Sequence, residues 1–236
     1  MDLKEVGLLG ADEGGHWYYA SKACALQRCL SDRKPEGILD VGAGSGFFSK
    51  MLLRRTTAQS AICVDPGYTE EWSETVDGKP ISFRRASPVG YADVVLLMDV
   101  IEHVDDDVGL LRSYAASARP GTRFVVSVPA FSWLWSRHDD FLEHRRRYTL
   151  SQTLRVLSEA GLSPSAGFYF FGVLFPAVVA QRLWNRVRDA ERPRSDLRQH
   201  HPLTNAILAG ICRAECAIAS HNKAFGLTAF GVAEKI

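Results

Sequence analysis

Short apolar runs alternate with amphipathic stretches through the front half of the chain. Helical spacing of apolar positions predicts helices at 47–55 and 102–118. The apolar runs themselves are mostly continuous rather than alternating, which is typical of a parallel sheet covered by helices on both faces. They predict strands at residues 37–41, 60–65, 81–85, 92–99 and 122–130.

The back half of the chain follows a different pattern. It begins with an irregular segment, 131–148, that is rich in aromatic and charged side chains. No charged residue occurs between Glu159 and Arg182, which is long enough to cross a bilayer, but glycines and prolines within this stretch favour two separate elements. The pattern predicts helices at 150–162, 176–188 and 203–219, and strands at 163–171 and 227–235.

These elements predict an α/β fold. It would contain a doubly wound, mostly parallel, seven-stranded sheet of Rossmann-like layout, with a helical insertion before the last strand. A chain of 236 residues is suited to one such domain with additions.

Composition narrows the class of protein further. The chain has 28 Lys plus Arg against 27 Asp plus Glu, with 46% apolar and 23% charged residues. These values exclude a disordered chain, a collagen-like repeat and a small disulfide scaffold. The near balance of charge also argues against a nucleic-acid partner, since domains that bind nucleic acid are usually strongly basic.

The cysteines and the N-terminus indicate the compartment. The five cysteines are odd in number and include no C-x-x-C pair. Cys212 and Cys216 lie one helical turn apart, and we interpret both as small buried hydrophobic side chains rather than metal ligands. The N-terminus has no apolar segment behind a basic start, so we expect no signal peptide and a cytoplasmic location.

The most informative run is the strand–turn–helix ILDVGAGSG at 38–46. Glycines at the carboxyl end of a strand let a ligand approach the backbone, and the next helix presents free N–H groups. The spacing differs from the G-x-G-x-x-G of a dinucleotide site, and the preceding Asp40 would repel a pyrophosphate. Asp65 ends the second strand, where an acid can hold the two hydroxyls of a ribose. The combination predicts a nucleoside ligand.

These residues resemble the class I S-adenosylmethionine-dependent methyltransferases. The run at 38–46 is similar to their first motif, VDP to their second-strand acid, and ADVVLLMDVIEHV to their fourth-strand motif. The resemblance extends from about residue 16 to residue 235. It is strongest to a bacterial group of small-molecule methyltransferases, through HWYY, Glu102-His103 and HRRRY. The family implies that GLTAFGVAEK forms a last strand inserted antiparallel between its neighbours.

The resemblance implies a binding site for S-adenosylmethionine, which would leave as S-adenosylhomocysteine. The turn after the first strand would line the methionine part, and the acid before it would support the turn and the cofactor's amino group. The second-strand acid would bind the ribose, and the fourth-strand acid would lie near the methionine end. The cofactor-binding residues implied in this way are Asp40, Gly42, Ala43, Gly44, Gly46, Asp65 and Asp99.

Further expected cofactor contacts lie outside these motifs. The aromatic residues before the first strand, Trp17 among them, are candidates for a lid over the cofactor, and Lys22 could meet its carboxylate. Many family members place an acid after the third strand for the adenine amino group. This chain has RRASPVGY there, so Ser87 or the backbone would take that role.

The loop after the fifth predicted strand carries the candidate catalytic residues. Ligands of open α/β sheets bind at the carboxyl ends of the strands, which places this loop beside the expected transfer point. An alcohol or phenol acceptor must lose a proton, for which a neutral histidine is suitable. We assign the base to His144, with His138 as the second candidate. The alternative is that both histidines only stabilise the loop.

The remaining acceptor-site candidates are Arg146, Tyr148 and His103. Arg146 is expected to bind an anionic acceptor, although a charge run such as RRR is more often a solvated face. Asp99, Glu102 and His103 form D-x-x-E-H, similar to a motif associated with a divalent metal in some quinone-type O-methyltransferases. Acids near the start of a helix are favourable without an ion, so we predict no metal and a His103 that faces the pocket.

The helix expected at 203–219 carries an apolar stripe. Stripes of this kind usually belong to a core or to a subunit interface. The alternative is a docking surface for a membrane or for a lipid-linked acceptor, because a basic amphipathic helix can lie at an interface. The stripe consists of Leu203, Ile207, Ile211, Ala214 and Ile218.

The sequence therefore predicts an S-adenosylmethionine-dependent methyltransferase that methylates an oxygen of a small, anionic or lipid-linked molecule. N- or C-methylation, or a cofactor-binding sensor or partner without catalysis, are the alternatives. The location would be cytoplasmic or membrane-peripheral, and the protein a monomer or homodimer. One domain over 1–236 would comprise an N-terminal lid (1–36), a cofactor-binding core (37–130), a substrate loop (131–148) and a helical insertion (172–224).

Overall fold

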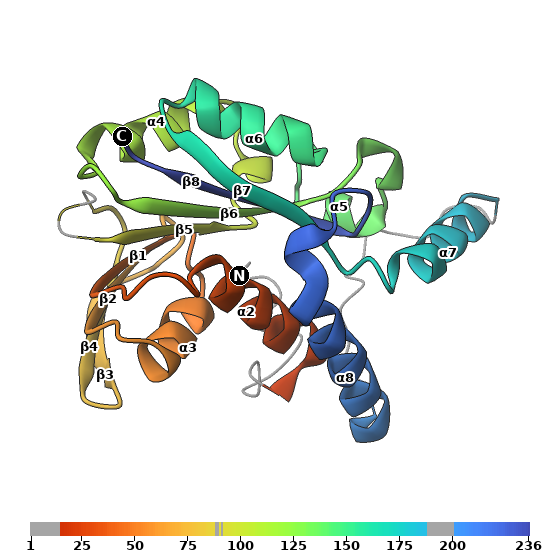
Figure 1. Ribbon diagram of the computed structural model, residues 1–236, viewed down its shortest axis with the longest axis horizontal. Helices are drawn as coiled ribbons and strands as arrows, with labels where there is room; N and C mark the ends of the chain where they lie inside the picture. The colour runs from red at the N-terminus through yellow and green to blue at the C-terminus, as the bar shows by residue number, and fades with distance from the viewer. Residues whose placement is uncertain (1–14, 88–89, 91, 188–200) are drawn as a thin grey trace.

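The computed structural model describes residues 15–87, 90, 92–187 and 201–236, and shows one sheet with helices on both faces (Figure 1). The strand order is β3-β4-β2-β1-β5-β6-β8-β7. The strands are β1 (Gly37–Val41), β2 (Ser60–Val64), β3 (Trp72–Val76), β4 (Lys79–Arg84), β5 (Val94–Met98), β6 (Arg123–Pro129), β7 (Ser163–Phe170) and β8 (Thr228–Glu234).

Helices connect these strands. Short 3₁₀ turns occur at Ile101–His103, Ser132–Leu134 and Ala219–His221. The helix expected from residue 102 starts later, because the Asp106 side chain caps it by accepting from the N–H of Gly109 at 2.7 Å. The α-helices are α2 (Trp17–Cys29), α3 (Phe47–Arg55), α4 (Asp107–Ser117), α5 (Arg137–Phe141), α6 (Leu150–Glu159), α7 (Phe175–Val187) and α8 (Pro202–Ile218).

The α/β fold with a mostly parallel sheet is confirmed, but the sheet has eight strands rather than seven. The extra strand is β3, which pairs antiparallel with β4. Asp77 and Gly78 join them with φ of 50° and 79°, and positive φ at both residues of a two-residue loop suits the twist of a hairpin. Four of the five β3 residues are exposed, so the strand lacks the apolar pattern on which the prediction relied.

The predicted position of the last strand is also confirmed. β8 lies between β6 and β7 and is antiparallel to both, with Val232 opposite Val125 and Phe230 opposite Phe168. β7 therefore runs parallel to β6, and six strands end at the same edge of the sheet. We call this the carboxyl edge. The glycine turn, the turn after β5 and the 131–148 segment all leave the sheet from it.

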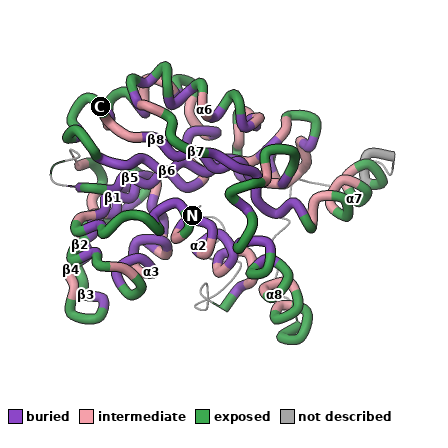
Figure 2. Tube along the Cα trace, in the orientation of Figure 1, coloured by how far each residue is buried: buried purple, intermediate pink, exposed green. Residues whose placement is uncertain are grey.

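The core explains why the strands are continuously apolar. Alternate side chains of one strand enter different clusters: in β1, Ile38 packs with α2 and α3, while Leu39 packs with α4 and α6. In β5, Leu96 and Leu97 separate in the same way. Both faces of the central strands are thus removed from water, which Figure 2 shows as a buried band through the middle of the molecule.

The insertion between β7 and β8 forms two helices that extend away from the sheet (Figure 1). α8 is fixed against α2 by a Cys24–Cys216 disulfide, which joins residues 192 positions apart. Cys212 and Cys216 were both expected to be small buried hydrophobic side chains. The partner of Cys216 was not predicted, because sequence spacing cannot reveal a partner at such a distance. Cys212 is buried with a free thiol. In a reducing compartment Cys24 and Cys216 would be two neighbouring thiols rather than a disulfide.

Some expectations concern residues outside this description. They are the first 14 residues of the lid expected at 1–36, the end of the helix expected to reach 188, the rest of the insertion up to 200, and residues 88, 89 and 91. Among the described residues, one helical segment, Pro202–His221, is long and apolar enough to cross a membrane. Length and composition alone do not distinguish a span from a surface helix.

Gly46 provides a test of packing at the glycine turn. It has φ +72°, and a Cβ there would lie 2.7 Å from the Phe83 ring, whereas a Cβ at Gly78, with φ +79°, would meet nothing within 4 Å. Gly78→Ala should cost about 1 kcal/mol from backbone strain alone. Gly46→Ala should cost about 2–4 kcal/mol, because overpacking adds to that strain. Urea unfolding of both variants measures the difference, and equal losses would contradict it.

Candidate active site

The glycine turn is held by Asp65 and Tyr68. The N–H of Gly44 donates to the Asp65 carboxylate at 3.1 Å, and the Tyr68 hydroxyl donates to the Gly44 carbonyl at 2.6 Å. The second Asp65 oxygen accepts from the N–H of Gly67 at 2.8 Å. The predicted ribose-binding acid therefore lies directly beside the predicted methionine-binding turn, as the two roles require.

Asp40 lies beneath this turn rather than in it. Its carboxylate is buried and accepts a hydrogen bond from the Ser49 hydroxyl of α3 at 2.8 Å. Burial raises the pKa of Asp40 from 3.8 to about 6, even though the Ser49 hydrogen bond acts in the opposite direction. Support of the turn fits this position, while a direct contact with the cofactor's amino group stays a prediction.

Asp99 ends β5 and forms an ion pair with Lys22. It adopts φ +56°, which is rare for a residue other than glycine and often found at functional sites. One carboxylate oxygen accepts from Lys22 Nζ and the other from the Ser127 hydroxyl at 3.2 Å. Burial opposes ionisation of Asp99, but the charge and hydrogen bond of Lys22 lower its pKa below the usual value. Lys22 thus meets an acid of the protein, and its contact with the cofactor carboxylate stays a prediction.

This ion pair fixes α2 over the carboxyl edge. The Lys22 side chain is fully buried, while about a third of the Asp99 side chain, 30%, is exposed. Next to it, Tyr18 stacks on Phe171 with ring centroids 5.2 Å apart, and the Trp17 ring meets Phe171 edge-on. The aromatic residues therefore lie above the strand ends, as a lid would, and the cofactor contact of Trp17 stays a prediction.

The 131–148 segment places His144 in a chain of charged groups. His144 Nδ1 lies 2.9 Å from Asp139 Oδ1. Arg147 donates to both Asp139 oxygens, at 2.6 and 2.9 Å, and to the carbonyl of Ala130 at 3.0 Å. Although burial acts in the other direction, the hydrogen bonds from His144 and Arg147 hold the pKa of Asp139 far below its usual range. An ionised Asp139 favours an Nδ1–H that donates to it, so Nε2 is the ring nitrogen that faces away from Asp139.

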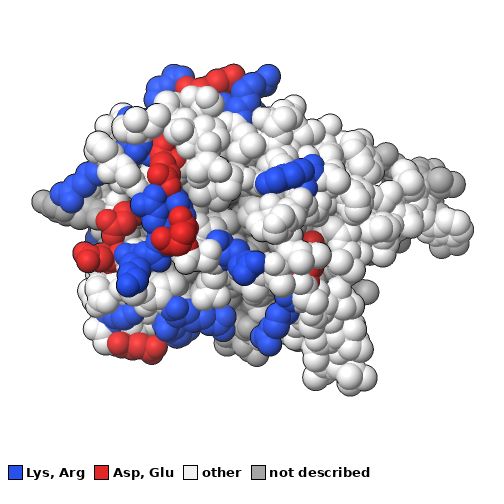
Figure 3. Space-filling view, in the orientation of Figure 1, with Lys and Arg blue, Asp and Glu red and all other residues white. Residues whose placement is uncertain are grey.

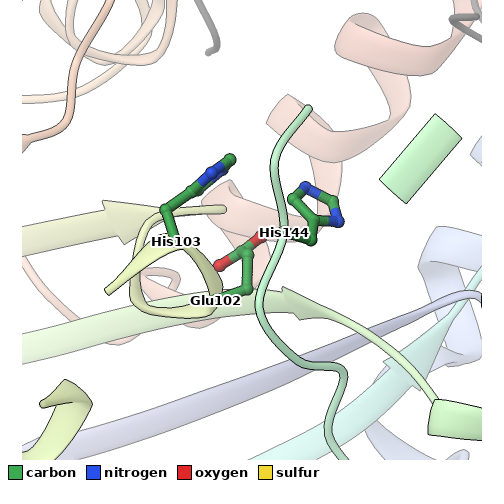
Figure 4. A group of neighbouring side chains, drawn as sticks. All are labelled: Glu102, His103 and His144. Atoms are coloured by element: carbon green, nitrogen blue, oxygen red, sulfur yellow. The ribbon is translucent and has the colours of Figure 1, made fainter. Parts of the chain in front are cut away.

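The other side of His144 meets Glu102. Glu102 and His144 side chains point toward one another, with His103 beside them (Figure 4). Ligand atoms of the three residues lie within 4.8 Å of one another, so the group could hold a metal ion. Both Glu102 oxygens and His144 Nε2 are buried without a hydrogen-bond partner among the described residues. Burial and the nearby Asp99 charge raise the pKa of Glu102, which favours its neutral form.

The other predicted residues of this site, His103, His138 and Arg146, lie at different distances from His144. The rings of His103 and His138 have centroids 4.8 and 6.4 Å from that of His144. Arg146 is not brought to the cluster: its guanidinium donates to the carbonyls of Val104 and Asp105 at 3.1 and 2.9 Å. A role for Arg146 in binding an anion stays a prediction and would require it to exchange these partners.

Tyr148 is a buried anchor of the same segment. Its hydroxyl donates to Asp107 Oδ2 at 2.7 Å, and its side chain packs beneath the loop rather than beside His144. Burial and the Asp107 hydrogen bond raise its pKa above the usual value, so the phenol stays protonated. Contact between Tyr148 and an acceptor is a prediction that this arrangement does not support.

Three site residues were given no such role by the sequence analysis. Asp139 was not singled out within the 131–148 segment, Glu102 was considered only as part of a motif, and Arg146 was preferred to Arg147. Ser136-x-x-Asp139 is a capping-box spacing and could have marked a short helix there, which is α5. Nothing in the local pattern indicates which arginine of the RRR run turns inward.

Comparisons with known proteins identify the family of this chain. A methyltransferase-domain family matches residues 15–165, more than half of the chain. The chain therefore belongs to this family, the class I S-adenosylmethionine-dependent methyltransferases.

Its curated relatives include ubiquinone biosynthesis O-methyltransferases. That of Methylobacterium sp. (strain 4-46) is 34% identical over 98 residues, covering 38% of this chain and 39% of the relative. That of Xanthomonas axonopodis pv. citri is 26% identical over 120 residues, covering 46% and 50%. The matches thus span half or less of these relatives.

Solved structures share the fold over most of the chain. The complex of the Haloferax volcanii Trm112 methyltransferase activator with a methyltransferase gives a TM-score of 0.52 at 15% identity, with 95% of this chain and 96% of that one covered. The pyocyanin biosynthetic protein PhzM gives 0.52 at 17% identity, with 92% and 56% covered.

Asp40 offers a test of the electrostatics beneath the turn. Because its pKa is raised to about 6, the folded state binds more protons than the unfolded state between about pH 4 and 6. Stability is thus lost as pH rises through this window, and ionised Asp40 disfavours the fold above it. Asp40→Asn should therefore increase the unfolding free energy of the ligand-free protein at pH 7.5 by about 1–2 kcal/mol.

The same Asp40→Asn comparison at pH 4.5 should show little or no gain, because the wild-type carboxyl is then protonated. Denaturant unfolding at the two pH values supplies both numbers. A gain of equal size at pH 4.5 and 7.5 would show that the charge of Asp40 is not its cause.

Proposed function

We propose that this protein transfers the methyl group of S-adenosylmethionine to an oxygen of a small-molecule acceptor, with His144 as the general base. The observation that carries the proposal is the Asp139–His144 pair, whose Nε2 is buried without a partner among the described residues. The O-methyltransferase names of the curated relatives support the choice of oxygen.

The residues at the carboxyl edge fit this cofactor. S-adenosylmethionine carries a sulfonium and an ammonium group, and supplies a methyl group that a nucleophile can attack when the cofactor is bound. Asp65 and Asp99 are partly exposed acids beside the glycine turn, so they complement a cationic nucleoside. Gly42 and Gly44, with positive φ, let the ligand approach the backbone.

The charged groups around His144 determine where the acceptor's proton goes. A hydroxyl acceptor that reaches the pocket would donate its proton to Nε2 of His144, which leaves an oxygen lone pair for in-line attack on the methyl carbon. The imidazolium that forms is stabilised by Asp139 through Nδ1–H. Because Arg147 keeps Asp139 ionised, the proton remains on the histidine.

Glu102 would complete the pocket on the other side of His144. In its neutral form it can donate one hydrogen bond to an acceptor oxygen and adds no negative charge beside the forming oxyanion. Glu102 is buried and the His144 side chain is only 5% exposed, and low exposure to water strengthens each of these interactions.

Replacement of the base should stop turnover without loss of cofactor binding. We expect His144→Ala to lower kcat by about 10²–10⁴-fold, the usual contribution of general base catalysis. Asp139→Asn should lower it less, since the imidazole remains but its imidazolium is stabilised less. The assay follows transfer of labelled methyl groups from the cofactor into metabolite pools, with mass spectrometry to identify the methylated atom. A label on nitrogen or carbon would contradict the proposal.

His221→Ala is the matched control for His144→Ala, because this histidine is exposed on the turn after α8, where its ring contacts the Ser220 hydroxyl. Its kcat should equal that of the wild type. S-adenosylhomocysteine binding measured by calorimetry should be the same in all these variants, which separates loss of chemistry from loss of fold.

Asp65 tests the cofactor site itself. Asp65→Ala removes the proposed acceptor of the ribose hydroxyls and should raise the Kd for S-adenosylhomocysteine by about 10–100-fold, the value of one or two hydrogen bonds to a charged group. Asp65→Asn retains one acceptor oxygen and should lie between. Glu70→Ala, an exposed acid nearby, is the control. An Asp65→Ala variant that is folded and binds as the wild type does would contradict the assignment.

A further inference from the structure

The two helices of the insertion expose large apolar side chains. On α8, Leu203, Ile207 and Ile218 are 65%, 54% and 66% exposed, and the first two lie one helical turn apart. On α7, Trp184 is 61% exposed and Leu183 51%. Figure 3 shows the outer parts of both helices almost without charged side chains. Exposed large apolar side chains that gather in this way are typical of a site that contacts another protein or a membrane.

In the described part of the insertion, the exposed charged side chains are cationic. Residues 172–187 and 201–223 contain a single acid, Glu215. Its side chain is buried and accepts from the N–H of Gly172 at 2.6 Å, so it is not presented to solvent. Arg213 and Lys223 are exposed within the same ranges, although Lys223 Nζ also donates to the carbonyl of Gly167. The surface thus combines apolar side chains with cationic ones.

We propose that α7 and α8 dock this protein on the surface of a bilayer that contains anionic lipids. Burial of the apolar residues in the acyl boundary would supply the affinity, and attraction of the cationic side chains to anionic headgroups would add to it. Trp184 suits this role, since tryptophan is enriched at the interface between membrane and water.

A second copy of this chain suits the surface less well. In a two-fold dimer the same patch meets itself, so the exposed cations would face one another with no exposed acid from the described part of the insertion to pair with them. Anionic headgroups pair with the same cations.

α8 would lie on the membrane and not cross it. Its other face packs on α2, where Cys212, Glu215 and Cys216 are buried. The N–H of Trp17 donates to the Asn205 side chain at 2.8 Å, and Arg28 donates to the carbonyl of Ala217 at 2.6 Å. Insertion across a bilayer would break these contacts and bring Glu215 and Arg213 into hydrocarbon.

The docking surface is connected to the candidate active site. α7 follows β7 and α8 precedes β8, so both leave the carboxyl edge, where His144 lies. Arg182 of α7 donates to the carbonyl of Leu134, and Phe175 contacts the rings of Phe131 and Trp133 at 5.7 and 5.9 Å. These partners belong to the segment that carries His144. If the proposed methyl transfer holds, the acceptor would be a lipid-soluble molecule taken from the membrane, whereas docking itself does not depend on that function.

The test is co-sedimentation of the full chain with vesicles, without any turnover. The wild type should bind vesicles of phosphatidylcholine containing one third phosphatidylglycerol, and bind pure phosphatidylcholine more weakly. Leu203→Ser with Ile207→Ser should reduce binding about tenfold or more, because each side chain loses a large apolar area. Arg213→Gln should reduce only the preference for anionic vesicles, as should high salt.

Ile236→Ser is the matched control, because Ile236 is 84% exposed but belongs to the chain terminus after β8, outside the insertion. It should bind vesicles as the wild type does. Unchanged S-adenosylhomocysteine affinity would show that the double variant is folded. If the wild type binds vesicles but transfers no methyl group, the catalytic proposal fails and the docking proposal stands.

Three outcomes would overturn the docking proposal: no binding of the wild type to anionic vesicles, equal binding by the Leu203→Ser, Ile207→Ser variant, or equal loss in Ile236→Ser. Sedimentation velocity identifies the competing occupant. A wild-type dimer that the double variant converts to monomer, together with no vesicle binding, would assign the surface to a second copy.

Discussion

A carboxylate taken out of water must be paired, hydrogen-bonded or protonated, and the carboxyl edge of this sheet meets that constraint several times within one site. Asp99 is paired with the buried Lys22, and Asp139 with Arg147 and His144. Asp40 has one hydroxyl partner and a raised pKa. Glu102 has no partner among the described residues and favours its neutral form. Asp99 and Asp139 are therefore held ionised by their partners, whereas burial favours the neutral forms of Asp40 and Glu102.

Each pairing also fixes an element of the fold. Lys22 can reach Asp99 only when α2 lies over the end of β5, so the ion pair closes the lid helix onto the strand ends. Arg147 holds Asp139 and the carbonyl of Ala130, so it ties the 131–148 segment to the end of β6. A charge introduced to stabilise a loop thereby also orients His144. Arg147 and Lys22 therefore hold the fold and also position the site residues. Substitution of either one would affect both stability and the site.

The insertion extends this coupling outward. α8 is joined to the lid helix by the disulfide and by hydrogen bonds between side chains and backbone, and α7 is joined to the segment of His144 by Arg182 and by ring contacts. The apolar helices therefore touch both parts of the protein that would close over the two substrates. If the proposed docking holds, a bilayer that contacts these helices would lie beside the segment that carries His144, and this is a reason for such helices to occur at this point in the chain.

Most elements and the cofactor motif could be predicted from local pattern, because strand burial and the glycine turn leave local signals. β1 and α3 have the predicted bounds, and Asp65 lies beside Gly44, as expected from its position at a strand end. The polar β3 was missed because its pairing leaves no apolar signal. Which side chains meet could not be predicted in this way. The choice of Arg147 over Arg146, the Lys22–Asp99 pair and the Cys24–Cys216 contact depend on how distant elements pack, and spacing along the chain carries no information about distances across the fold.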